Sequence, residues 1–252
     1  QMAPPPARRV SDEGSIEPAS ERFSGYIFKI QANMNPAHRD RIAFLRIVSG
    51  KFERGMTVRH VRAGKEIKLA QPQQFLAQDR DIVEVAYPGD IIGLFDPGIF
   101  RLGDTLCQRG SFTFNELPTF SPELFCKVTI KNTLKHKQYQ KGIEQLTEEG
   151  TIQLFRSLNF DETILGVVGQ LQFEVFEYRM KYEYGVDIDM YRLNWQIARW
   201  IEGDNIDPGK FRVNSTLVKD KHDRFVGLFE NEYALRSAME RNPTLTFLET
   251  PR

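Results

Sequence analysis

Short apolar runs separated by Gly, Pro and Asp dominate residues 22–118. Runs of this kind, with β-branched and aromatic residues between turn signals, are typical of strands. They predict strands over 25–32, 42–48, 56–62, 66–69, 74–76, 82–85, 91–95 and around Leu106. Their regular spacing predicts a closed or sandwiched all-β domain, a β-barrel over residues 22–118.

The pattern changes at residues 119–122. Alternating or apolar runs then predict strands over 123–131, 151–155, 162–168 and 186–191, and helical periods predict helices over 134–148 and 170–184. The resulting order, β-α-β-β-α-β, is that of a ferredoxin-like α+β domain.

The helix expected over 170–184 is strongly amphipathic. Leu171, Val175, Tyr178 and Tyr182 lie on one stripe of it. Further strands over 195–202, 215–219, 225–229 and 245–248, with a helix over 232–241, form an α/β extension that completes the domain at 119–252. The pattern leaves open whether this extension continues the same sheet or forms a small subdomain.

Residues 1–21 are rich in Pro, Ser, Ala and charge, so they are expected to form a flexible linker or tail. Because the chain opens at Gln1, we expect a fragment. It holds no apolar run of about 18 residues and no signal-peptide pattern, so neither a membrane partner nor secretion is expected. Two cysteines outside any C-x-x-C pair fit a reduced, cytoplasmic protein.

Formal net charge is zero, so affinity for nucleic acid would have to come from local patches. One candidate lies in the connection 33–41, which is longer than a hairpin needs. Arginine and lysine there and on neighbouring strands can donate to phosphate oxygens. The candidate phosphate donors are Lys29, His38, Arg39, Arg41, Lys51, Arg54, Arg62 and Lys65. The alternative is a solvated barrel rim.

A second basic set follows residue 122: Lys127, Lys131, Lys135, Lys137 and Lys141. Lys137 and Lys141 are one helical turn apart and share a face. They are expected either to contact a partner or to pair with Glu144 and Glu148. The four histidines are scattered with no spacing suited to a metal, so no metal site is expected.

Three segments resemble the β-barrel second domain of translational GTPases: RIVSGKFERG at 46–55, YPGDIIG at 87–93 and GDTL at 103–106. Residues 28–41, 121–125, 148–155 and 166–173 are similar to the bacterial peptide chain release factor 3 family, the class-II termination factors. The resemblance covers about residues 22–250.

The resemblance implies domains II and III of such a factor without its GTPase domain. The chain has no G-x-x-x-x-G-K-[ST] loop, so we expect no GTP or Mg²⁺ site and no enzymatic activity in it. By resemblance, the full-length factor uses GTP to stimulate termination and the recycling of codon-reading release factors.

The implied partners are the small-subunit RNA and a small-subunit protein of the bacterial ribosome, with the factor's own GTPase domain. The codon-reading release factors would be indirect partners. On this basis Arg39→Glu/Arg41→Glu is expected to weaken ribosome binding while leaving the fold intact.

Three alternatives compete with this interpretation. A translocation factor would continue into further domains, and its match to residues 28–41 is poorer. An acylphosphatase shares the β-α-β-β-α-β order but needs an arginine after the first strand, where this chain reads Lys131-Asn132-Thr133-Leu134. The third alternative is a generic RNA-binding module, although the aromatic-Gly signature of an RRM is absent.

Overall fold

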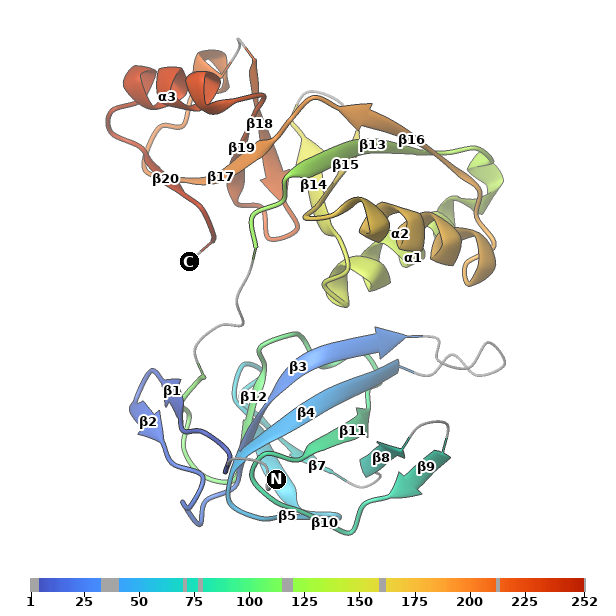
Figure 1. Ribbon diagram of the computed structural model, residues 1–252, viewed down its shortest axis with the longest axis vertical. Helices are drawn as coiled ribbons and strands as arrows, with labels where there is room; N and C mark the ends of the chain where they lie inside the picture. The colour runs from blue at the N-terminus through green and yellow to red at the C-terminus, as the bar shows by residue number, and fades with distance from the viewer. Residues whose placement is uncertain are drawn as a thin grey trace. The chain divides into compact units, whose positions relative to one another are not determined.

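The computed structural model describes residues 5–32, 41–69, 72–76, 79–114, 120–158, 162–211 and 214–251. The chain divides into two compact units, Gln1–Pro118 (unit 1) and Thr119–Arg252 (unit 2). Figure 1 labels the elements of each unit. Among the described residues, no helix is long and apolar enough to span a membrane.

Unit 1 consists of short antiparallel strands, most of them in one sheet. Its strands are β1 (Arg9–Ser11), β2 (Gly14–Ile16), β3 (Ser24–Ala32), β4 (Arg41–Ser49), β5 (Phe52–Glu53), β6 (Thr57–His60), β7 (Lys65–Lys68), β8 (Pro72–Leu76), β9 (Asp79–Ile82), β10 (Val85–Ala86), β11 (Ile91–Phe95) and β12 (Thr105–Cys107). The main sheet has eight strands in the order β7-β6-β12-β3-β4-β11-β8-β9. It curls strongly, and the small β10-β5 pair lies at one end of it (Figure 1).

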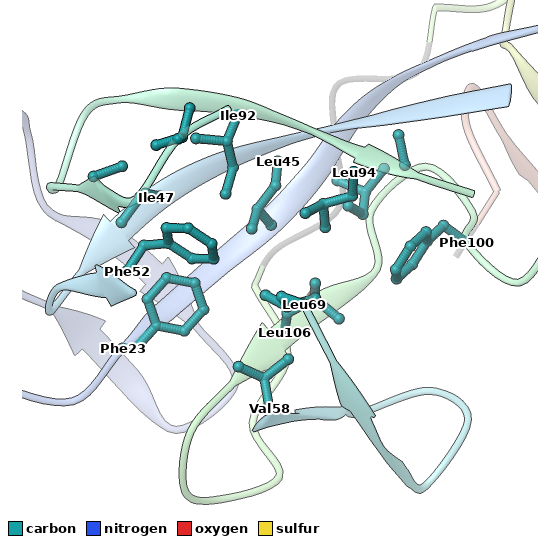
Figure 2. Close-up of a cluster of buried hydrophobic side chains, with 14 of the residues drawn as sticks. Phe23, Leu45, Ile47, Phe52, Val58, Leu69, Ile92, Leu94, Phe100 and Leu106 are labelled. Carbon is teal, nitrogen blue, oxygen red and sulfur yellow. The ribbon is translucent and has the colours of Figure 1, made fainter. Parts of the chain in front are cut away.

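The inner face of this curled sheet holds the core of unit 1. Successive residues of a strand point to opposite faces, so β4 buries Ala43, Leu45 and Ile47 on the inner face. Figure 2 shows Leu45 and Ile47 facing the same cluster as residues from the other strands. The alternation that predicted these strands therefore also identifies their core side. The pairing of β3 with β4 shifts register between Ile27 and Lys29.

The N-terminal segment differs from the expected flexible linker. Arg9–Ser11 and Gly14–Ile16 pair as a hairpin. The guanidinium of Arg9 lies 3.8 Å from the centroid of the Tyr26 ring, and Asp12 accepts hydrogen bonds from the backbone N–H and hydroxyl of Thr113, both at 2.8 Å. These contacts with the rest of unit 1 give a polar segment the partners that its own composition cannot supply.

Unit 2 contains one sheet with helices. Its elements are β13 (Leu124–Ile130), η1 (Thr133–Lys135), α1 (His136–Glu148), β14 (Gln153–Ser157), β15 (Thr163–Val167), α2 (Gln170–Tyr182), β16 (Ile188–Leu193), β17 (Ile197–Glu202), η2 (Pro208–Lys210), β18 (Ser215–Asp220), β19 (Phe225–Phe229), α3 (Glu232–Arg241) and β20 (Thr246–Leu248). The strands follow the order β16-β13-β15-β14-β18-β19-β17-β20 in one eight-stranded sheet. The strands of the C-terminal extension, β17 to β20, thus continue the sheet formed by β13 to β16, and the β14–β18 pair joins the two parts.

The helices pack on two parts of that sheet. Side chains of α1 and α2 share a core with residues of β13 and β15. Helix α3 packs on β18 and β19, in a different part of the sheet (Figure 1). Gly142 of α1 lies against α2, where an added Cβ would meet the Sδ atom of Met180 at 2.5 Å. The absent side chain lets the two helices approach closely.

Helix α2 buries only one of its two apolar faces. An amphipathic helix ordinarily buries its apolar stripe, yet the stripe that runs from Leu171 to Tyr182 is exposed. Phe173, Phe176 and Met180 are buried instead. The helix is apolar on two opposite faces, so its sequence period does not say which one meets the sheet.

Candidate nucleic-acid interface

The outer face of β3 and β4 combines cations with aromatic rings. Lys29 pairs in register with Phe44, and its Nζ atom lies 5.3 Å from the centroid of that ring. Phe28 lies 6.5 Å from the same ring, centroid to centroid, and both phenylalanines are partly buried. Arg46, two residues beyond Phe44 on β4, is exposed on the same face. Cations beside aromatic rings suit both phosphates and bases of nucleic acid.

Sequence reasoning selected Lys29 but missed Arg46. The signal was present, because Arg46 interrupts an apolar strand and lies between Leu45 and Ile47. Both neighbours are buried, so the alternation of the strand directs Arg46 outward. Within the described residues, neither Lys29 nor Arg46 has a carboxylate partner within salt-bridge distance.

Arg41 has a structural role that the sequence reading did not anticipate. Its Nε atom lies 2.6 Å from Oδ2 of Asp96, and its Nη2 atom donates to the backbone oxygen of Phe100 at 2.9 Å. The Arg41 side chain is 11% exposed and that of Asp96 is 0% exposed. Asp96 also accepts three backbone N–H groups, from residues 98–100. Contrary to the expectation from sequence, we therefore predict that reversing the charge of Arg41 disturbs the fold.

Arg62 is likewise held by a carboxylate. Its Nε atom lies 2.6 Å from Oδ1 of Asp104, and Nη2 lies 2.8 Å from Oδ2. Nε2 of the buried His60 lies 2.7 Å from Oδ2 of the same carboxylate. Burial by itself raises the pKa of Asp104, but the hydrogen bonds from Arg62 and His60 outweigh it and leave that pKa below its ordinary value of 3.8.

We expect unit 1 to lose stability in acid because of Asp104. A carboxyl whose pKa is lower in the folded chain than in the unfolded chain stabilises the fold above its ordinary pKa. That stabilisation is lost as pH falls below about 3.8 and through the lower folded pKa. This loss of stability can be measured by unfolding the chain in urea at a series of pH values, with hydrogen exchange of the β12 amides as the probe of unit 1. Asp104→Asn should flatten this dependence; an unchanged slope in that variant would contradict the assignment.

The remaining candidates in unit 1 lie on its surface. Lys51 and Arg54 form exposed ion pairs, with Nζ to Glu53 at 2.8 Å and Nη1 to Glu84 at 2.7 Å. The hydrogen bond to Glu53 raises the pKa of Lys51. Exposed pairs of this kind contribute little to stability, so either cation can exchange its carboxylate for a phosphate. Lys65 is exposed at the start of β7.

Two candidates, His38 and Arg39, lie outside the described residues. They belong to the connection between β3 and β4, which joins the two strands that carry Lys29 and Arg46.

The basic residues of unit 2 divide into paired and unpaired groups. Lys127 pairs with Glu162 at 2.5 Å and Lys131 with Asp189 at 3.2 Å, and Lys135 donates to the backbone oxygen of Gly185. Lys137 and Lys141 are exposed on α1. In the part of the chain that the structure describes, no ion pair is seen between either of these lysines and Glu144 or Glu148, so both ammonium groups are accessible to a partner.

Two family models match the chain, one over each unit. Residues 22–109 match elongation factor G domain 2. Residues 114–239 match the class II release factor RF3, C-terminal domain. The second match favours a termination factor over a translocation factor.

Curated relatives match nearly the whole chain. It is 54% identical over 253 residues to peptide chain release factor 3 of Symbiobacterium thermophilum, covering 99% of this chain and 48% of the relative. The corresponding proteins of Listeria welshimeri and Staphylococcus haemolyticus are 52% and 51% identical, over 97% and 96% of this chain and 47% of each relative. The chain thus spans about half the length of these relatives.

A solved structure supports the fold. The crystal structure of a protein from Thermus thermophilus matches 73% of this chain and 28% of its own, with a TM-score of 0.59 and 20% identity. At that identity the likeness concerns the fold alone.

Proposed function

We propose a function from one premise, that this chain belongs to the class II release factor RF3 family. In this proposal it is the portion of a termination factor that docks on the bacterial ribosome. The observation that carries the proposal is the outer face of β3 and β4, where Lys29 and Arg46 flank partly buried phenylalanines. That face would contact small-subunit ribosomal RNA, with phosphates bound by the cations.

The two units would correspond to domains II and III of the family. The match to elongation factor G domain 2 and the curled sheet support a barrel of the translation-factor type for unit 1, over residues 22–118. In unit 2, the strand order β16-β13-β15-β14, all antiparallel, supports a ferredoxin-like arrangement for residues 123–193.

Further cations would add to the docking surfaces. In unit 1 these are His38, Arg39, Lys51, Arg54 and Lys65. In unit 2, Lys137 and Lys141 are the strongest candidates for contact with a small-subunit ribosomal protein, because both are exposed on one face of α1. Lys127, Lys131 and Lys135 would take part only by giving up the partners described above.

The GTP-dependent step would belong to the part of the family's length that this chain does not span. A full-length factor would bind GTP and Mg²⁺ in its GTPase domain and drive recycling of the codon-reading release factors in the cytoplasm. The two units would pass the nucleotide state to the ribosome by moving relative to that domain. This chain would not hydrolyse GTP.

Co-sedimentation with purified bacterial ribosomes tests the docking face. Lys29→Gln/Arg46→Gln is expected to weaken binding about ten-fold near 0.1 M salt, because two phosphate contacts are lost. The matched control is Lys210→Gln/Arg236→Gln, which removes the same charge from exposed positions of unit 2. Equal binding by both double variants would contradict the proposal.

A further inference from the structure

Helix α2 carries an exposed apolar face directly opposite its buried one. We call Leu171, Val175, Tyr178 and Tyr182 the α2 seam. They are 68%, 40%, 62% and 65% exposed, respectively. The rings of Tyr178 and Tyr182 lie 4.5 Å apart, centroid to centroid. The seam therefore extends along about three turns of one helix face.

The spacing of the seam is that of a helix–helix contact. Its members are separated by four, three and four residues, which is the a/d spacing of a coiled-coil heptad. A stripe of this width accepts the side chains of one other helix lying along it. Scattered apolar residues on a surface would show no such period.

The charges beside the seam are predominantly acidic. Glu174, Glu177 and Lys181 lie along one flank. On the other flank Arg179 is held by Glu149 and Glu183, at 2.5 and 2.7 Å. Arg192 of β16, whose Nη2 atom donates to Oε1 of Gln170, adds a third cation beside the first flank. Four carboxylates against three cations give these flanks a formal charge of −1. They therefore favour a helix that carries lysine or arginine beside its own apolar stripe.

The size of the seam argues against a second copy of this chain. Four side chains exposed to this degree offer on the order of 400 Å². A stable interface between two proteins needs roughly 800 Å² on each partner. The seam is thus too small to hold a dimer alone, but it fits one contact within a larger assembly.

We propose that the α2 seam docks a basic amphipathic helix of a ribosomal protein. The inference rests on the proposed function, since it places this chain on the ribosome. The partner helix would lay its apolar stripe along the seam and set its lysines or arginines beside Glu174 and Glu177. Unit 2 would then bind by an apolar contact that is separate from the basic surfaces of α1 and of unit 1.

Neutral substitutions test the seam by ribosome co-sedimentation. Leu171→Gln/Tyr178→Gln is expected to weaken binding roughly ten-fold, because apolar anchors dominate such contacts. The slope of log affinity against log salt should not change, since the lost contacts release no counterions. Tyr233→Gln/Met239→Gln, which removes two exposed apolar side chains from α3, is the matched control and should bind as wild type. Circular dichroism checks that every variant is folded.

A photo-crosslinker identifies the occupant. Benzoylphenylalanine at position 175 should crosslink to a ribosomal protein, at a helix with apolar a/d spacing and flanking lysine or arginine. Crosslinks to RNA, seam variants that bind as wild type, or a concentration-dependent dimer abolished by those variants would each overturn the inference. Wild-type chain that does not bind ribosomes would overturn the proposed function, and the inference with it. Normal binding by wild type and seam variants alike would overturn the inference alone.

Discussion

Arg41→Glu is expected to unfold much of unit 1. The substitution would place a second carboxylate against Asp96, whose side chain is fully buried. Breaking a buried ion pair costs about 3–5 kcal/mol, because it leaves an uncompensated charge. The hydrogen bond from Arg41 to the backbone oxygen of Phe100 would also be lost. The strand pair β4–β11, which ends at Arg41 and Asp96, should be affected first.

The positions of the tryptophans separate the effects on the two units. Trp195 and Trp200, the two tryptophans of the chain, both lie in unit 2, so their fluorescence in urea reports unit 2. Hydrogen exchange of β4 amides reports unit 1. We expect early exchange in β4 and an unchanged fluorescence transition. Arg41→Lys keeps the charge and should lose much less stability. If the β4 amides of Arg41→Glu exchanged as slowly as those of the wild type, the ion pair would contribute little to the stability of unit 1.

Gly50→Val is expected to be comparably severe. Gly50 follows β4 with a φ of +69°, in the left-handed region that valine rarely adopts. A Cβ there would lie 2.5 Å from the backbone nitrogen of Phe23. Backbone atoms cannot rotate away as a side chain can, so the start of β3 would have to move. Strain and overpacking together should cost about 3 kcal/mol or more.

Hydrogen exchange of β3 amides measures this loss, with Trp fluorescence again reporting unit 2. The control is Gly64→Val, at a φ of +63° but with open space around the added Cβ. This control has the backbone strain of a positive φ without a collision of the added Cβ, so the difference between the two variants gives the cost of the collision. Equal destabilisation by both variants would show that the close approach to Phe23 is unimportant.

The sequence predicted the long strands and the helices of this fold because their periods are local. It missed the hairpin of β1 and β2, since its partners Tyr26 and Thr113 lie far away in the sequence. A three-residue strand has too short a period to be recognised by itself. The order of the strands from β14 to β20 could not be read from the pattern either.

The two faces of α2 show a second limit. Leu171 and Phe173 belong to opposite apolar faces, so the hydrophobic period fits either orientation. Gly142 and the packing of α1 against Met180 select the buried face, and both are tertiary contacts.

The candidate site shows the same limit for charge. Lys29 lies in the predicted strand before the connection 33–41 and Arg41 lies at the end of that connection, and the two look alike as phosphate donors. The two cations differ in the fold because Asp96, which lies 55 residues beyond Arg41 in the chain, binds Arg41. Residue type and spacing identify cations, but only the fold identifies those that already have a buried partner.

Ribosome co-sedimentation across a salt series is the decisive test of the proposed docking face. We predict saturable binding whose log affinity falls linearly with log salt, by roughly 0.7–0.9 per phosphate contact. The slope for Lys29→Gln/Arg46→Gln should be shallower by about two contacts. No binding by folded wild-type chain at low salt, or an identical slope in the variant, would contradict the claim that β3 and β4 dock on ribosomal RNA.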